Sequence, residues 1–329
     1  GALLAEAEVA RGSALTTTMD PEGVRILEAS VPLAEASGDG YTLWRALNNA
    51  GSYYQEVGEL RKAYDLHDRA LELSERMGDM QQLGFLLSNV AETLIGLGEW
   101  KEARVRAERA LAASQSVVDS WDRAYPWLQL GLISLREGNI EEAERILTSC
   151  VTDARAYDDL QALSWALPLL AEINLLRGDA EGAHRLLEPL MTTPEPYFRY
   201  HVGPVFAWAL LERGDVEAAE KAATETIAEI RDKGVRQALS VALVVLGKIR
   251  IAQGERSKAA EAFAESVDLC RDMPMPFGQA WALSEWGLMD HNPSLLLEAL
   301  DIFRRLGASK DVERIELALS NLSPSPAAG

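Results

Sequence analysis

A six-residue phrase recurs along this chain at almost constant spacing. Each copy begins with Gly and a polar residue and ends in Ala, and the copies end at Ala63, Ala103, Ala143, Ala183, Ala219 and Ala259. Successive Ala positions are 40, 40, 40, 36 and 40 residues apart, and one further step of 40 leads to Ala299, where the Gly is missing. A period of about 20–50 residues is typical of stacked-repeat proteins. The spacing therefore predicts a solenoid in which each repeat adds its own section of core.

Each period is expected to hold two helices joined at the recurring Gly. A helix C-terminus favours Gly because the chain there often adopts a left-handed conformation, and the acidic residue or Asn that follows can cap the next helix. We predict an all-α, right-handed α-solenoid of about seven to eight hairpins, with an atypical helix pair at 1–40, repeats over 41–306, a capping helix at 307–321 and a flexible tail at 322–329. The repeats are expected at 41–80, 81–120, 121–160, 161–196, 197–236, 237–276 and 277–306.

Small residues recur seven positions before each turn Gly. These positions hold Gly51, Ala91, Gly131, Ala171, Ala207 and Gly247. Two helices approach closely only where side chains leave room, so these residues and the recurring Ala are predicted to form the helix crossing within each pair.

Charge and cysteine content limit the possible roles. Lys and Arg number 32 and Asp and Glu 51, which gives a net charge of −19. Such a charge repels nucleic-acid phosphates and anionic membrane surfaces. Cys150 and Cys270 lie far apart and indicate no disulfide framework, so a cytoplasmic location is expected. Because the sequence begins at Gly1 and enters helix-like sequence at once, we interpret it as part of a longer protein.

No catalytic constellation is visible in the sequence. The four histidines have no metal-ligand spacing and no phosphate-binding Gly-rich loop occurs. His67 lies on a predicted core-facing position and Cys150 stands where other repeats have Ala, so both are expected to be buried and structural. We therefore predict no enzymatic activity, no metal and no cofactor; an enzyme remains a weaker alternative.

The pattern resembles the tetratricopeptide repeat. A large residue, a small one, an aromatic, a turn Gly and an Ala follow at the spacing of that family in Leu47, Gly51, Tyr54, Gly58 and Ala63. The resemblance covers about residues 20–306. This chain departs from the family in its period, 40 instead of about 34 residues, and in lacking the Pro that usually ends the second helix.

A second and less specific resemblance concerns the longer repeats. They are similar to those in the C-terminal sensor arms of MalT-like and other signal-transduction ATPases of bacteria. The closing segment 299–314, which contains Phe303, Gly307 and Val312, resembles the end of those arms.

The family resemblance implies that first helices line a concave wall where partners bind. Carried over to this sequence, it implies a wall that is polar at its N-terminal end and apolar-aromatic in the middle. The candidate binding residues are Arg45, Asn49, Ser52, Asn89, Tyr125, Gln129, Trp165, Glu172, Trp208 and Lys248.

Two alternatives stay open for these residues. Asn49 and Asn89 occupy the same place in neighbouring repeats, where an amide can hold a peptide backbone or form a structural hydrogen bond between helices. Tyr125, Trp165 and Trp208 form either an exposed apolar patch that binds a partner or part of a tightly curled core. Pro168 and Pro204 are expected to bend the wall.

The leading hypothesis is a sensor or scaffold arm of a multidomain bacterial regulator. It would bind a peptide, a protein segment or a small-molecule inducer in the groove and pass a change in curvature to an N-terminal effector domain of the same chain. The alternatives are a free-standing scaffold that bridges protein partners and a structural homo-oligomer.

Overall fold

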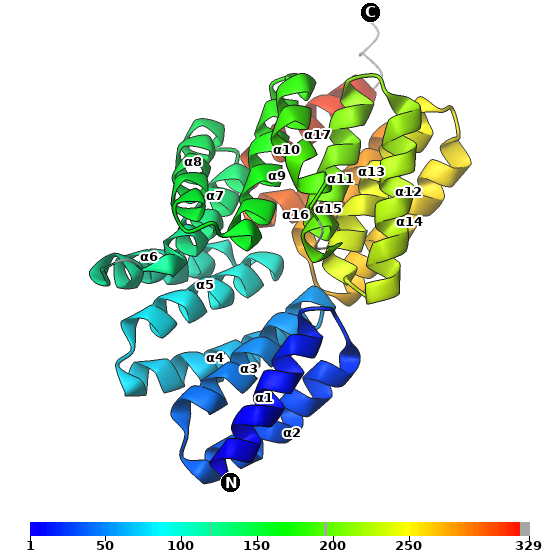
Figure 1. Ribbon diagram of the computed structural model, residues 1–329. Coiled ribbons are helices and arrows are strands. Elements are labelled where there is room, and N and C mark those ends of the chain that lie inside the picture. Colours follow the sequence, from blue (N-terminus) through cyan, green and yellow to red (C-terminus); the bar gives the residue numbers. More distant parts are fainter. Residues whose placement is uncertain (119, 194–195, 323–329) are drawn as a thin grey trace, which may run out of the picture.

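The computed structural model describes residues 1–118, 120–193 and 196–322, and these form a row of helix hairpins (Figure 1). The N-terminal pair is α1 (Ala2–Thr16) and α2 (Pro21–Ser37). The first helices of the later pairs are α3 (Gly40–Glu56), α5 (Met80–Gly96), α7 (Ala124–Glu137), α9 (Leu160–Leu176), α11 (Pro196–Glu212), α13 (Arg236–Ala252) and α15 (Pro276–Asp290). The second helices are α4 (Leu60–Met77), α6 (Trp100–Ser116), α8 (Ile140–Ala156), α10 (Ala180–Met191), α12 (Val216–Lys233), α14 (Arg256–Asp272) and α16 (Pro293–Leu306), and α17 (Ser309–Leu322) closes the series.

The predicted all-α solenoid is confirmed, since the described residues contain helices and no strand. One helix begins later than expected: the short 3-10 helix η1 (Trp121–Arg123) precedes α7. The buried carboxylate of Asp122 shapes this turn by accepting hydrogen bonds from the hydroxyls of Ser114 and Ser120. The predicted flexible tail, except for Leu322, lies outside the described residues.

The recurring Gly behaves as the sequence predicted. The turn glycines have φ between +77° and +90°, the left-handed region that residues with a Cβ adopt at a cost. They are Gly58, Gly98, Gly138, Gly178, Gly214 and Gly254. In the last pair His291 takes this role with φ +49°.

The small residues do lie at the helix crossings, and the structure identifies what faces them. A Cβ added to Gly51 would come 2.5 Å from the ring of His67, and one added to Gly247 would come 2.4 Å from the ring of Phe263. Both rings lie four residues beyond the recurring Ala, on the second helix of the same pair. Where the first helix carries Ala91 instead of Gly, the facing position holds only Ala107, in the same core cluster. The two helices thus compensate each other in size, which preserves close packing.

At the crossing of the N-terminal pair, backbone atoms instead of a side chain face each glycine. A Cβ on Gly12 would lie 2.9 Å from the carbonyl oxygen of Gly23, and a Cβ on Gly23 would lie 2.8 Å from the carbonyl oxygen of Gly12. Backbone atoms cannot move aside as a flexible side chain can, so this crossing requires glycine on both helices.

The superhelix closes on itself, which the sequence did not predict. The turn at Gly58 approaches Met273, and the turn at Gly98 approaches Pro276 and Leu306. The turn at Gly138 approaches the segment 309–310. The hydroxyl of Ser309 donates to the carbonyl oxygen of Glu137 at 2.6 Å, and the side-chain amide of Gln237 donates to the carbonyl oxygen of Gln55 at 2.8 Å. Trp100 packs on Phe277 with ring centroids 5.9 Å apart. We call these contacts the seam. They join the turns that follow α3, α5 and α7 to the segment from α13 to α17, so the inner wall encloses space.

No helix in the described part of the chain is long and apolar enough to cross a membrane.

Candidate functional site

The inner wall encloses a cavity of about 270 Å³ next to the seam. Its lining comes mainly from first helices, because each of these presents one face to the superhelix axis. We call it the tryptophan cavity, after Trp165, Trp208 and Trp281, each of which is half-buried there. Pro168 and Pro204, both inside helices, also line it. Inner-wall positions carried over from the repeat pattern recur in the lining: Glu92, Leu128, Gln129, Leu132, Trp165, Leu169, Glu172, His201, Val205, Trp208, Val241 and Trp281.

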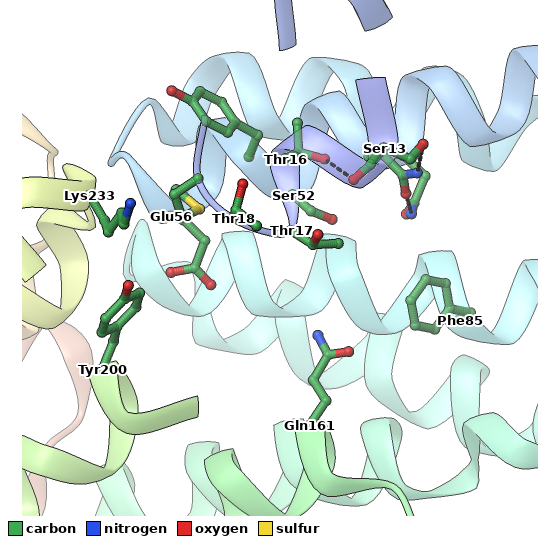
Figure 2. Close-up of a pocket in the computed structure, with 14 residues that line it drawn as sticks. Ser13, Thr16, Thr17, Thr18, Ser52, Glu56, Phe85, Gln161, Tyr200 and Lys233 are labelled. Carbon is green, nitrogen blue, oxygen red and sulfur yellow. Dashed lines mark hydrogen bonds between the residues drawn. The ribbon is translucent and has the colours of Figure 1, made fainter. Parts of the chain in front are cut away.

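A second cavity, of about 660 Å³, lies between the α1–α2 connection and the inner wall. We call it the threonine cavity, because Thr16, Thr17 and Thr18 form one side of it (Figure 2). Gln161 and Tyr200 lie on the opposite side in Figure 2. Asn48, Asn49, Ser52, Phe85 and Lys233 complete much of the lining, and Glu56 and Tyr200 line both cavities.

Two glutamates on the inner wall are paired with cations of this chain. Glu172 accepts two hydrogen bonds from the guanidinium of Arg136, one of them at 3.0 Å. Glu285 lies 2.6 Å from Arg314 and 3.9 Å from Lys248. Burial alone would raise the pKa of Glu285, but Lys248 and Arg314 outweigh burial and hold that pKa below its ordinary value.

Glu92 is different, because no arginine or lysine of the described residues pairs with it. Burial raises the pKa of Glu92 from 4.5 to about 8; the nearby Glu56 carboxylate raises it further and a hydrogen bond from Gln55 opposes the shift. Glu56 is 9 % exposed and its Oε1 lies 3.6 Å from Nε2 of His201. The tryptophan cavity therefore contains a carboxyl group that favours its protonated form at neutral pH.

Aromatic side chains form a continuous row along the inner wall. Ring centroids lie 5.3 Å apart for Phe85 and Tyr125, 6.2 Å for Tyr125 and Trp165, and 5.7 Å for Trp165 and His201. Tyr125 is buried, and burial together with the neighbouring Asp159 raises the pKa of its hydroxyl. Both alternatives for the aromatic residues thus occur in one row: Tyr125 belongs to the core and Trp165 lines a cavity.

The candidate asparagines take part in a chain of hydrogen bonds between helices. The amide of Asn49 donates to the hydroxyl of Ser13 at 2.6 Å, that of Asn48 donates to Asn49 at 3.0 Å, and that of Asn89 donates to Asn48 at 2.8 Å. Asn89 is 8 % exposed. The structural alternative therefore accounts for one amide donor of Asn49 and one of Asn89.

The structure brings six of the ten candidate residues to a cavity. Asn49 and Ser52 line the threonine cavity, and Gln129, Trp165, Glu172 and Trp208 line the tryptophan cavity. The other four lie elsewhere: Arg45 has its guanidinium carbon 5.9 Å from the ring centroid of Tyr41, Lys248 lies over the ring of Trp208 at 4.9 Å, and Asn89 and Tyr125 are buried.

Several cavity residues were missed because they do not occupy inner-wall repeat positions. Thr16, Thr17 and Thr18 lie between the first two helices, and Lys233 ends α12. Phe277 reaches the tryptophan cavity only because the seam brings the start of α15 there. No repeat pattern in the sequence could have identified it.

The residues singled out for their chemistry are buried. His67 is 1 % exposed, and burial lowers its pKa from 6.5 to about 4. Cys150 and Cys270 are free and buried, and burial raises the pKa of both thiols. Among the described residues no group of His, Cys, Asp or Glu could hold a metal ion.

Helix hairpins stacked around a hollow inner wall define an α-solenoid of the helical-repeat class. Residues 41–116 match the family model described as tetratricopeptide repeat. The same hairpin pattern continues through the rest of the described chain, so the matched segment lies within a longer row of similar hairpins. No curated protein matches the sequence at a significant level.

Solved structures of similar fold are distant in sequence. The apo form of the quorum sensor NprR from B. thuringiensis is 13% identical, with 96% of this chain and 86% of that chain covered and a TM-score of 0.55. A Rap protein complexed with Competence and Sporulation Factor is 16% identical, with 93% and 80% covered and a TM-score of 0.41. A signal-transduction ATPase (STAND) protein with a tetratricopeptide-repeat sensor, from Pyrococcus horikoshii, is 14% identical with a TM-score of 0.46; the match covers 92% of this chain and 52% of that one.

Proposed function

We propose that this chain is a non-enzymatic sensor or scaffold arm that binds a peptide or protein segment in the tryptophan cavity. The observation that carries the proposal is the presence of three half-buried tryptophans around one enclosed space on the inner wall. Aromatic side chains in a desolvated pocket contribute most of the affinity in many interfaces. Apolar groups of the partner would pack against Trp165 and Trp208, while polar groups of the threonine cavity would face the rest of its chain.

The seam offers a way to transmit binding. Arg136 lines the tryptophan cavity, pairs with Glu172 and lies over the ring of Phe277 at 4.7 Å. A partner that displaces any of these side chains changes the contact between the two ends of the superhelix. We propose that this movement passes to an effector domain in a longer protein, as in a bacterial signalling or transcription regulator with a MalT-like arm.

The fold of NprR, a quorum sensor, is consistent with a sensor role. A free-standing cytoplasmic scaffold that bridges two proteins is the second candidate, because the same cavity could hold a segment of either partner. Binding of a small-molecule inducer would also use the tryptophan cavity. The length of the gene upstream of Gly1 distinguishes the arm from the scaffold.

Selection of phage-displayed random heptapeptides against the whole chain tests the proposal. We expect selected peptides to bind, and the double variant Trp165→Ala, Trp208→Ala to weaken them at least about tenfold. The matched control is Trp286→Ala, because Trp286 is half-buried but lines neither cavity. Failure to select any peptide, or unchanged affinity in a correctly folded double variant, would overturn the proposal.

A further inference from the structure

The inner wall repeats one arrangement, in which a glutamate and an aromatic ring together hold a cation. Arg136 pairs with Glu172 and lies 4.7 Å from the ring centroid of Phe277. Lys248 lies 3.9 Å from Glu285 and 4.9 Å from the ring centroid of Trp208. Carboxylates and aromatic faces both attract cations, and their effect is strongest away from water. The wall thus holds two of its own cations in the same way.

Glu92 occupies the same repeat position as Glu172 but lacks such a cation. Each stands six residues before its turn glycine, at Gly98 and Gly178. Glu92 lines the tryptophan cavity together with Trp165, and no described arginine or lysine forms an ion pair with it. Glu56 lines the same cavity and adds a second carboxylate. Two acidic groups beside an aromatic ring make this part of the cavity suited to a positive charge.

A separate observation points to a hydrogen-bond donor in the same place. Gln129 lines the tryptophan cavity and is 1 % exposed, and its Oε1 accepts no hydrogen bond from the described residues. A buried acceptor without a donor is costly, and native proteins rarely leave one. An ammonium or guanidinium group carries several donors and no acceptor, so it could satisfy both Gln129 and Glu92.

Within the binding role proposed above, we infer that Glu92, Glu56, Gln129 and Trp165 form a subsite for an organic cation: a primary ammonium or guanidinium group. In a peptide this group is a lysine or arginine side chain, and in a small molecule it is a free amine. The charges around the subsite are Glu56, with His201 opposite it, and the closed pair of Arg136 and Glu172. The net charge of −19 also draws cations toward the chain.

The protonation of Glu92 adds a measurable signature. Burial raises the pKa of Glu92 to about 8, so at neutral pH the carboxyl holds a proton that an arriving cation would displace. Binding is therefore expected to strengthen as pH rises, by about tenfold per unit below pH 8, and to release a proton to the buffer.

Three probes test the subsite by calorimetry on the whole chain: N-acetyl-lysine methylamide, N-acetyl-norleucine methylamide and n-butylamine. We expect the lysine derivative to bind at least about tenfold more tightly than its uncharged norleucine counterpart. Glu92→Gln should abolish this preference, and Gln129→Leu should reduce it. Glu141→Gln, which changes an exposed glutamate of α8, should preserve it.

The outcomes separate this inference from the proposed function. Tighter binding of the lysine derivative than of n-butylamine supports a peptide source for the cation, and equal binding supports a free amine. Equal affinity for lysine and norleucine derivatives overturns the subsite, as does a preference that survives in Glu92→Gln. If heptapeptides are selected without enrichment of Lys or Arg, the cation subsite is contradicted and the proposed peptide binding is supported. If no heptapeptide is selected but n-butylamine binds and Glu92→Gln abolishes that binding, the cation subsite is supported and the proposed peptide binding is contradicted.

Discussion

The threonine cavity and the tryptophan cavity share Glu56 and Tyr200 but differ in how the polar groups of their linings are hydrogen-bonded. In the threonine cavity the amides of Asn48 and Asn49 donate hydrogen bonds within the chain. In the tryptophan cavity Gln129 Oε1 and Trp165 Nε1 have no partner among the described residues. Satisfied groups stabilise the wall itself, whereas buried groups without partners raise the free energy of the unliganded protein. The comparison therefore favours the tryptophan cavity, the smaller of the two, as the proposed recognition site.

The largest expected effect on stability distinguishes Glu172 from Glu92, which occupy equivalent repeat positions. Glu172→Gln leaves the poorly exposed guanidinium of Arg136 without its carboxylate, and we expect it to lower the free energy of unfolding by about 3 kcal/mol. Glu92→Gln removes a carboxyl that has no cation and must keep its proton in the native state, so at neutral pH it should raise the free energy of unfolding instead of lowering it. Urea denaturation measures both. Equal losses would show that Glu92 is part of a structural pair.

The next largest effect on stability concerns the helix crossings at Gly247 and Gly23. Gly247→Ala, whose Cβ would meet the ring of Phe263, should cost about 2 kcal/mol and lower the midpoint of global unfolding. Gly23→Ala, whose Cβ would meet backbone, should instead detach α1 and open the threonine cavity. Hydrogen exchange distinguishes these results. Loss of protection throughout the chain in Gly23→Ala would contradict a local role.

Glu92 and His67 predict opposite dependences of the free energy of unfolding on pH. From pH 4.5 to about 8 the native state keeps the proton of Glu92 that the unfolded chain releases, so this group makes the free energy of unfolding fall as pH rises. From pH 6.5 down to about 4, His67 binds a proton in the unfolded chain but stays neutral in the native state. This group therefore makes the free energy of unfolding fall as pH decreases.

Variants of Glu92 and His67 test which group causes each dependence of the free energy of unfolding on pH. Glu92→Gln should flatten the decline in the free energy of unfolding above pH 6.5. Between pH 4.5 and 6.5 the two contributions oppose each other, so His67→Phe should make the free energy of unfolding rise as pH decreases there. Denaturation midpoints measured across pH 4–8 provide the data. An unchanged alkaline slope in Glu92→Gln would mean that other groups carry it.

The smallest effect tests the asparagine chain. Asn89→Ala removes the hydrogen bond to Asn48 and should cost about 1 kcal/mol. Ser52→Ala, at a half-buried position on the threonine cavity, should change stability by less than about 0.5 kcal/mol. If Asn89→Ala weakens a selected peptide without lowering stability, Asn89 contacts the partner directly.

Local features of the fold could be predicted from sequence, because the repeat makes each one visible several times. The turn glycines and the Gly51 crossing follow from spacing alone, and so does the burial of His67. The seam could not be predicted. It joins Gly58 to Met273 and Glu137 to Ser309, and their pairing depends on how far each repeat rotates against the next. No single position encodes that rotation.

The candidate site was predictable only in part for the same reason. Trp165, Gln129 and Trp208 were found because they recur on the inner face of first helices. The repeat pattern cannot say whether such a residue meets open space or a neighbouring helix, as the contrast between Trp165 and the buried Tyr125 shows. Phe277 enters the site from across the seam.

The seam has a consequence for how such a chain can change over time. A solenoid with free ends tolerates gain or loss of a unit, because each unit depends only on its neighbours. Here a duplication of one unit between α8 and α14 would carry Met273 and Ser309 past the turns at Gly58 and Gly138, and the two sides of the seam would no longer meet. The number of units between the joined turns is therefore fixed by geometry, and removal of α17 would break the seam at Gly138.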